Sequence, residues 1–423
     1  MSSAPMNERL LQFIWQHRFA NLQDLFSTDG MPLRIIHPGK YNSNQGPDFL
    51  EARVQVGQET WIGHVELHIR SSDWLLHGHN EAGHYRNLIL HVVWEHDCSL
   101  RLSCPTLELR SRIPGIMLQR FEHLMKTKEA LPCSSLSAGL DPIRQQKWIE
   151  HLLWERLEQK SNEIRVDLEA GQFHWEQTAW KWMARYAGLP VNQEAFEAMA
   201  ASIPFSVLIR HRSQQIQLEA LLMGQAGLLD TVFTDHYPVL LQKEYRFLQK
   251  KYQLTGSGCR VNFLRMRPAS FPTIRISQLA ALIHQQGQVF SRLRDMEDVG
   301  DAMRLLQVSA NDYWNDHYLP DKPAPFSQKH TGGHMVRGWL VNAFIPLIYC
   351  YGQVNRMQAL QEKAIDWLHQ LPAENHQLIR RMSATGLPNQ SAADSQALIR
   401  LQKNYCDDRR CLQCAIGHAI LSK

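Results

Sequence analysis

Acidic and histidine side chains near the N-terminus have types and spacing suited to metal-assisted chemistry. Glu66 and His68 lie two residues apart in the segment WIGHVELHI, and Asp48 precedes them in the segment GPDFLEARV. Carboxylate oxygens are the ligands that Mg²⁺ and Mn²⁺ prefer. A metal held by two carboxylates acidifies a bound water and stabilises the charge that develops on a phosphoryl oxygen. The pattern therefore predicts a divalent-metal site suited to hydrolysis.

These residues lie in segments whose alternation of polar and apolar side chains predicts β-strands. Strands are predicted over PLRIIH, DFLEARVQV and WIGHVELHI, with Gly57-Gln58 as the turn of a hairpin between the last two. Because strand side chains alternate between faces, Glu66 and His68 share one face, and the apolar residues between them form the core face. The hairpin folds Asp48 alongside, so we expect Asp48, Glu66 and His68 to form one site.

The surrounding segments complete a small α/β domain over residues 1–130. Residues 7–19 have the apolar spacing of an amphipathic helix, with Asn7 as its cap. The run LILHVVW is apolar on both faces, which favours a central strand covered on both sides. Its His91 is expected to be a hydrogen-bonded core histidine, and TLELR predicts one more strand.

The dipeptide PD at 47–48, followed by ELH at 66–68 on the second strand of a hairpin, resembles the signature of the PD-(D/E)xK nucleases. That family places a helix first, often with an acidic residue, where Glu8 stands here. The resemblance implies a mixed sheet with flanking helices, Mg²⁺ or Mn²⁺ as cofactor, and DNA or RNA as partner. It implies catalytic roles for Glu8, Asp48, Glu66 and His68. His68 replaces the lysine of the family and has no permanent charge at pH 7, and the helix before the last strand would be short, about 80–86.

A histidine-rich loop after the acidic strand leaves other interpretations open. His77 and His79 have a spacing that can bind zinc or iron and could line the same pocket as Glu66. One alternative is therefore a metal-binding enzyme that acts on a small molecule through a His/Glu site. A second is a catalytically inactive nuclease-like domain that binds nucleic acid or protein. The simplest is a solvated strand face that carries charged residues.

The rest of the chain, residues 140–423, has the pattern of a larger all-α domain. Helical patterns cover 142–169, 174–187, 193–202, 214–223, 236–252, 274–285, 287–306, 335–351, 353–370, 373–384 and 391–404. Strand signals are almost absent there. The join between the domains is expected at 131–141.

Cysteines near the C-terminus have a spacing that could hold a metal. Cys406, Cys411 and Cys414 cluster, and Cys133 or His418 could supply a fourth ligand. Such a set could bind structural Zn²⁺. Some PD-(D/E)xK nucleases join distant segments with a four-cysteine iron–sulfur cluster, so that resemblance implies a second candidate. The alternative is a buried helix whose small apolar positions are cysteines.

Composition sets the wider limits. The 423 residues carry a formal charge of only +4, so the whole chain does not indicate nucleic-acid binding, although a local groove could still be basic. Eight cysteines are too sparse for a disulfide scaffold. The most apolar segment, 339–351, is shorter than the roughly 18–20 residues of a bilayer span, and no secretory signal precedes residue 11. We therefore expect a cytoplasmic protein with no membrane partner.

A broader resemblance covers nearly the full length. From NERLLQFIW through GPDFLEARV, SSDWLLHGH and RPASFPTIRISQLA to YCDDRRCLQCAIG, the chain resembles one uncharacterised bacterial family, filed under a domain of unknown function. This resemblance implies a self-contained bacterial protein and supplies no activity.

Overall fold

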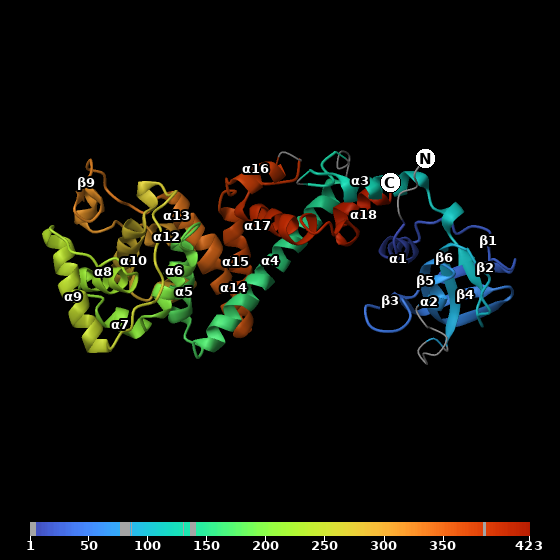
Figure 1. Cartoon of the computed structure of the whole chain (residues 1–423), viewed down its shortest axis with the longest axis horizontal. Helices are drawn as coiled ribbons and strands as arrows, with labels where there is room; N and C mark the ends of the chain where they lie inside the picture. The colour runs from blue at the N-terminus through green and yellow to red at the C-terminus, as the bar shows by residue number, and fades with distance from the viewer. Residues whose placement is uncertain (1–5, 77–84, 86, 130, 136–140, 384–385) are drawn as a thin grey trace. The chain divides into compact units, whose positions relative to one another are not determined.

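The chain forms two structural units, each built from more than one stretch of sequence. The computed structural model describes residues 6–76, 85, 87–129, 131–135, 141–383 and 386–423. The first unit comprises Met1–Trp148, Arg380–Leu387 and Ile399–Lys423, and the second comprises Ile149–Ile379 and Pro388–Leu398. The first unit contains a large sheet and the second is mostly helical (Figure 1). The prediction of an α/β part and a larger helical part is confirmed at this level.

A mixed sheet forms the centre of the first unit. Its strands are β1 (Leu25–Phe26), β2 (Pro32–His37), β3 (Lys40–Tyr41), β4 (Phe49–Val56), β5 (Glu59–Arg70), β6 (Leu88–Glu95) and β7 (Thr106–Glu108). The order is β1-β2-β4-β5-β6-β7, and β3 pairs with β4. The pairs up to β5 are antiparallel, whereas β5–β6 and β6–β7 are parallel. The hairpin and the central position of β6 were both predicted correctly.

The sequence pattern explains these strands. Along β4 the buried residues are mainly alternate ones, including Val54 and Val56, as expected for a strand with one face in the core. Gly57 adopts a φ of +60°, which suits the tight turn into β5. Residues 88–93 of β6 are all buried, as expected for a strand covered on both faces.

Three helices accompany the sheet in sequence. They are α1 (Glu8–His17), α2 (Asp73–Leu76) and α3 (Gly115–Lys126), with a 3₁₀ turn at Arg110–Arg112. The Asn7 side chain caps α1 by accepting a hydrogen bond from the Leu10 backbone N–H at 2.9 Å, as predicted. The apolar stripe of α1 is buried, and the helix packs against β5 (Figure 1). The short helix expected at about 80–86 lies outside the described residues, apart from Tyr85.

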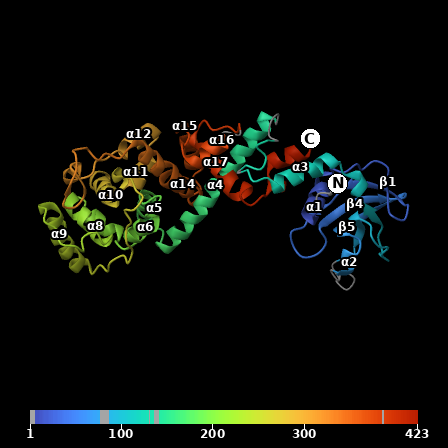
Figure 2. The same cartoon turned by 45° about the horizontal axis from the view of Figure 1, so that its top comes forward.

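The C-terminal segment, which the sequence analysis grouped with the all-α domain, lies in the first unit. Its elements are a π-helical turn (Gln402–Cys406), a 3₁₀ turn (Cys411–Gln413) and α18 (Ala415–Leu421). Helix α18 lies beside α3 in both views (Figures 1 and 2). Arg120 donates a hydrogen bond to the Ile420 carbonyl at 3.2 Å, and Arg409 donates one to the Thr127 carbonyl at 2.5 Å. These contacts join residues about 300 positions apart, which no local pattern reveals.

Most of the predicted helices lie in the helical unit, and α4, α16 and α17 each have one end in the first unit. The helices from α4 onward are α4 (Pro142–Ala170), α5 (Trp175–Ala187), α6 (Gln193–Ala201), α7 (Phe205–Arg210), α8 (Gln215–Gln225), α9 (His236–Tyr252), α10 (Pro272–Gln286), α11 (Val289–Asp295), α12 (Val299–Leu305), α13 (Gly333–Trp339), α14 (Ile345–Val354), α15 (Gln358–Gln370), α16 (Gln377–Ser383) and α17 (Ala392–Leu401). A π-helical segment (Leu340–Phe344) joins α13 to α14, and 3₁₀ turns cover Pro268–Ser270 and Asp312–Asn315. None of the described helices combines the length and apolar character that a membrane crossing needs.

Two details differ from the sequence prediction. The single helix expected over 287–306 is divided into α11 and α12, because Met296 is extended and Asp298 caps the second helix by accepting from the Asp301 N–H. A small hairpin, β8 (His317–Leu319) with β9 (Lys322–Pro323), also interrupts the helices. Its turn includes Asp321 at a φ of +58°.

A buried carboxyl group organises the helical unit. Glu219 of α8 is fully buried; its Oε1 accepts from the Trp314 indole at 2.6 Å and its Oε2 accepts from the Ser277 hydroxyl at 2.7 Å. Burial raises the pKa of Glu219 to about 7, and these hydrogen bonds oppose the rise. This group therefore holds three segments together.

We expect Glu219→Ala to lower the free energy of unfolding by about 2–4 kcal/mol, because it leaves a cavity and removes the partner of two buried donors. Denaturant unfolding followed by circular dichroism measures the change. The control is Glu362→Ala on α15, where the side chain is exposed, and a change within about 0.5 kcal/mol is expected. Equal effects of the two substitutions would contradict a structural role for Glu219.

Candidate functional site

A bulge in β4 sets the register of the acidic hairpin. Ala52 pairs with Gly63, but Phe49 pairs with Val65, so the pairing shifts by one residue between them. Glu51 lies inside this irregular stretch and has a φ of +57°. A bulge inserts an extra residue into one strand, and a shift of one residue changes which side chains share a face.

The bulge brings Asp48 to Glu66. The Phe49–Val65 pairing, continued by one residue beyond β4, places Asp48 opposite Glu66. The register of Ala52–Val56, continued without the bulge, would have placed Asp48 opposite Leu67. The Asp48 backbone N–H donates to Glu66 Oε2 at 3.0 Å, and the Leu67 backbone N–H donates to Asp48 Oδ2 at 2.9 Å. The two carboxyl groups are thus fixed on neighbouring strands by reciprocal hydrogen bonds.

Helix α1 adds two more side chains. The Gln12 amide donates to Asp48 Oδ1 at 2.8 Å. Glu8 lies one turn earlier, and residues four apart share a helix face. The charge of Glu8 contributes to raising the pKa of Glu66, so Glu8 also faces the site. The structure therefore brings together the three carboxyl groups singled out in the sequence.

The environment of Glu66 is unfavourable to its charge. Only 5% of its surface is exposed. Burial raises the pKa of Glu66 to about 8, the charge of Asp48 and then that of Glu8 add to the rise, and the hydrogen bond from the Asp48 backbone opposes it. A solvated strand face, the simplest alternative, is therefore wrong for Glu66. Clustered carboxyl groups of this kind are relieved by a proton or a cation.

His68 lies behind Glu66 and is buried, with 1% of its surface exposed. Its Nδ1 lies 3.0 Å from His91 Nε2, so one ring donates a hydrogen bond and the other accepts it. Its Nε2 lies 3.9 Å from Glu66 Oε1. His91 is fully buried, and its prediction as a hydrogen-bonded core histidine is confirmed. The two buried imidazoles therefore link β5 to β6 next to Glu66.

Aromatic side chains form an apolar wall next to these histidines. The Trp74 ring of α2 lies 5.3 Å from the His91 ring and 5.6 Å from the Tyr85 ring, both in edge-to-face geometry. Burial, followed by the charge of Glu66, raises the pKa of Tyr85 to about 12. His77 and His79, which we expected as metal ligands, lie outside the described residues.

A groove of about 720 Å³ adjoins the site on the side of α1. Gln12, whose amide contacts Asp48, is part of its lining. Its charged lining residues are Arg9, Asp408, Arg409 and Arg410. We call this the arginine groove, because three cations and one anion give it a positive balance although the whole chain is nearly neutral.

Contacts with neighbouring residues fix the positions of two arginines of the groove. Arg409 is anchored through the Thr127 carbonyl. Arg410 donates to the Asn404 carbonyl at 3.2 Å, and its guanidinium lies 5.5 Å from the centre of the Tyr405 ring. Arg410 nevertheless remains exposed. An exposed, oriented guanidinium is suited to binding phosphate.

The donor set at the hairpin suits a hard cation. Asp48, Glu66 and Glu8 offer only oxygen atoms, the ligands of Mg²⁺ and Mn²⁺. As the side chains stand, no group of three or more His, Cys, Asp or Glu within the described ranges is arranged to hold a metal ion. The fit therefore depends on the chemistry of the donors and on the repulsion that raises the pKa of Glu66.

The predicted cysteines also converge within the first unit. Cys133, Cys406, Cys411 and Cys414 all line one small cavity of about 20 Å³. His418, the alternative fourth ligand, packs instead against the rings of His17 and Phe19, at 4.3 and 5.3 Å. The alternative of one buried helix that carries the C-terminal cysteines is wrong, since Cys414 is the extended residue that precedes α18.

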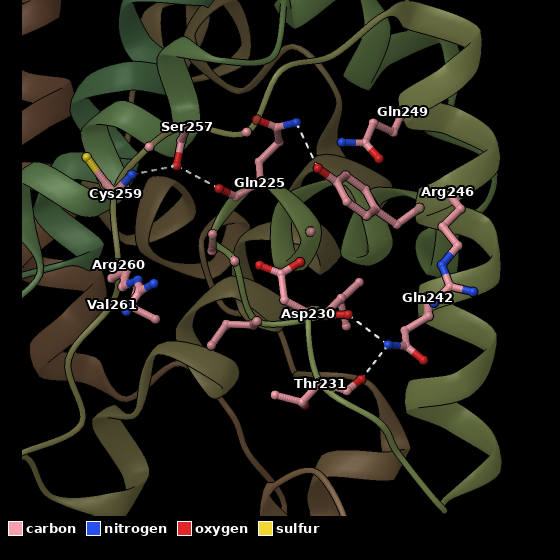
Figure 3. Close-up of a pocket in the computed structure, with 18 of the residues that line it drawn as sticks. Gln225, Asp230, Thr231, Gln242, Arg246, Gln249, Ser257, Cys259, Arg260 and Val261 are labelled. Atoms are coloured by element: carbon pink, nitrogen blue, oxygen red, sulfur yellow. Dashed lines mark hydrogen bonds between the residues drawn. The ribbon is translucent and has the colours of Figure 1, made fainter.

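A separate pocket of about 890 Å³ lies in the helical unit (Figure 3). Asp230 points into it, and Arg246 lines it from α9. The Gln242 amide donates to the carbonyls of Leu229 and Thr231 at 2.7 and 2.6 Å, which fixes one wall. Its lining has a single carboxylate, so it suits paired-carboxylate chemistry less well than the hairpin does.

Sequence reasoning did not identify Gln12 or the arginine groove. Gln12 carries a weak signal, because it lies four residues after Glu8 on the same helix. Arg409 and Arg410 lie between two of the clustered cysteines, and their approach to α1 depends on contacts between the two ends of the chain.

Comparison with known proteins gives a family but no activity. A family model described as "Protein of unknown function (DUF2851)" matches residues 8–377. No curated protein and no solved structure matches the chain. The expected likeness to a family of unknown function is thereby confirmed, whereas these comparisons do not support the PD-(D/E)xK resemblance. The match includes the hairpin site and Cys133, and the three C-terminal cysteines lie beyond it.

Proposed function

We propose that this chain, which belongs to the DUF2851 family of proteins of unknown function, is a divalent-metal-dependent nuclease that acts at the β4–β5 hairpin. The proposal depends mainly on one observation, the convergence of Glu8, Asp48 and Glu66 beside the arginine groove. Clustered carboxylates favour a cation, and a neighbouring set of arginines favours a phosphate-rich substrate.

Each group at the site has a distinct role in this proposal. Asp48 and Glu66 would hold Mg²⁺ or Mn²⁺, with Glu8 as a third oxygen donor. When bound, such an ion would supply Lewis acidity for the activation of water and for the stabilisation of negative charge on phosphate. Gln12 orients Asp48 through their hydrogen bond.

His68 takes the place that lysine has in the PD-(D/E)xK pattern, and its role here is to position Glu66. The His68–His91 pair is buried, and a neutral imidazole brings no permanent charge. The positive charge that faces the scissile phosphate therefore has to come from the metal and from the arginines of the groove.

The main competing function is a catalytically inactive domain that binds nucleic acid through the same groove. A small-molecule enzyme that uses a His/Glu site remains the other alternative. The arginine groove favours a phosphodiester over a small apolar substrate, because binding to a nucleic-acid backbone depends on cationic side chains.

The direct test is cleavage of labelled single-stranded DNA, duplex DNA and RNA by the full chain with Mg²⁺ or Mn²⁺ and with EDTA. We expect cleavage of at least one substrate with metal and none with EDTA. Binding without cleavage would favour the inactive domain. The absence of both binding and cleavage would reject the proposal.

We expect replacement of Arg410 by Ala to weaken binding of nucleic acid and to reduce the dependence of log K on log salt concentration. Loss of one phosphate contact lowers that slope by about 0.9 for duplex DNA. Fluorescence anisotropy over a range of NaCl concentrations measures both quantities. The matched control is Arg53→Ala, an exposed arginine of β4 that does not line the groove. Equal slopes for wild type and R410A would show that the groove does not contact phosphate.

A further inference from the structure

Four cysteines from two distant parts of the chain surround one cavity in the first unit. Cys133 precedes α4, whereas Cys406, Cys411 and Cys414 lie in the C-terminal segment. Each is 7–8% exposed, and together they line a cavity of about 20 Å³ whose other walls include Leu131, Tyr405 and Ile416. All four are free thiols.

The packing around these thiols is specific. A Cβ on Gly417 would lie 2.1 Å from the Cys411 carbonyl oxygen, so only glycine allows the chain to approach Cys411 this closely. N–H groups of Gly417, Ile416 and Trp148 face the Cys414 sulfur. N–H donors of this kind are typical partners of a sulfur that carries negative charge.

Ordinary core packing does not account well for this arrangement. A single free cysteine behaves as a small apolar residue and is often buried. Here, however, four of the eight cysteines of the chain meet around one cavity, although they come from segments far apart in sequence. Isolated core positions give no reason for such convergence.

We infer that Cys133, Cys406, Cys411 and Cys414 ligate a structural metal centre through their four thiolates. Two centres share this chemistry, a zinc ion and an iron–sulfur cluster. Zinc–sulfur bonds of about 2.3 Å would draw the sulfurs to within about 3.8 Å of one another.

Such a centre would also hold the loop that carries the groove arginines. Asp407–Arg410 lies between two of the ligands, Cys406 and Cys411. Fixing both ends of this loop, with Cys133 as the link to the N-terminal part of the chain, would hold Arg409 and Arg410 at the arginine groove. The metal centre itself does not depend on the proposed nuclease activity.

The test is metal and sulfide analysis of the full chain purified without oxygen, together with its absorption spectrum. About one zinc per chain, or two to four iron atoms with matching sulfide and visible absorption, would each support the centre and distinguish its two forms. Protein that lacks metal is then incubated anaerobically with Zn²⁺, or with ferrous and ferric iron together with sulfide. Wild type that carries no metal and takes up neither would overturn the proposal.

Variants then assign the ligands. We expect Cys133→Ser and Cys411→Ser to lower bound metal at least tenfold, with circular dichroism as a check on folding. Cys350→Ser is the matched control, because Cys350 is fully buried in the helical unit, and it should retain the metal. Asp48→Asn should also retain it, which separates this centre from the hairpin site. Retention of metal by both ligand variants would reject the assignment even if both are stable.

Discussion

Asp48→Asn is expected to lower metal-dependent cleavage by on the order of a thousandfold, equivalent to about 4 kcal/mol of transition-state stabilisation. The substitution keeps the size of the side chain and its ability to accept a hydrogen bond from Leu67 N–H, but it removes one of the charges that hold the cation. Steady-state cleavage of a labelled oligonucleotide with Mg²⁺ or Mn²⁺ measures the loss.

The control for this prediction is Glu51→Gln on the same strand. Glu51 is exposed and pairs with Lys40 at 2.6 Å on the surface, so its loss should leave cleavage within about twofold. D48N should still bind the oligonucleotide, since the arginine groove is intact. If the wild type cleaves and D48N cleaves equally fast, the hairpin is not the active site.

Local patterns were sufficient to predict the elements that carry the site. Two-residue alternation identified β4 and β5 and placed Glu66 and His68 on one face, and Asn7 marked the start of α1. These features depend on residues close in sequence. The turn at Gly57 could be predicted for the same reason, because glycine readily adopts a positive φ.

The register of the site could not be predicted in this way. Asp48 faces Glu66 only because of the bulge near Glu51, and no residue type in that stretch requires a bulge. The burial of Glu66 likewise depends on tertiary packing, since α1 covers part of the sheet and contributes Gln12. A polar residue on an alternating strand is normally taken as exposed, and here that assumption fails.

Contacts between the two ends of the chain were also beyond local reasoning. The cysteine spacing indicated a cluster, but the choice of Cys133 over His418 depends on how the C-terminal segment packs beside α3. The arginine groove arises from the same packing, since α1 and the C-terminal segment both line it. A composition with a charge of +4 gave no indication of it.

The raised pKa of Glu66 predicts a distinct dependence of stability on pH. The titratable groups around it are Asp48, Glu8, His68, His91 and Tyr85. Its pKa is about 8 in the folded protein, compared with 4.5 for an ordinary glutamate. Between these values the folded state binds more protons than the unfolded state, so the free energy of unfolding falls as pH rises from 4.5 to 8. The largest loss that this shift allows is about 5 kcal/mol.

Glu66→Gln should remove that loss. In EDTA, we expect wild type to lose stability relative to E66Q between pH 5 and pH 8; the buried Glu219 contributes equally to both proteins and cancels. A cation can take the place of the proton, so saturating Mn²⁺ should stabilise wild type at pH 8, by about 2.7 kcal/mol at one hundred times Kd. It should have little effect on E66Q. Denaturant unfolding at the two pH values, with EDTA and with Mn²⁺, measures the pH-dependent loss and the effect of Mn²⁺ for both proteins. If the free energy of unfolding depends on pH in the same way for the two proteins, Glu66 is ionised in the folded state at neutral pH. A carboxylate that is stable there without a proton or a cation would remove the physical reason for a metal at this hairpin.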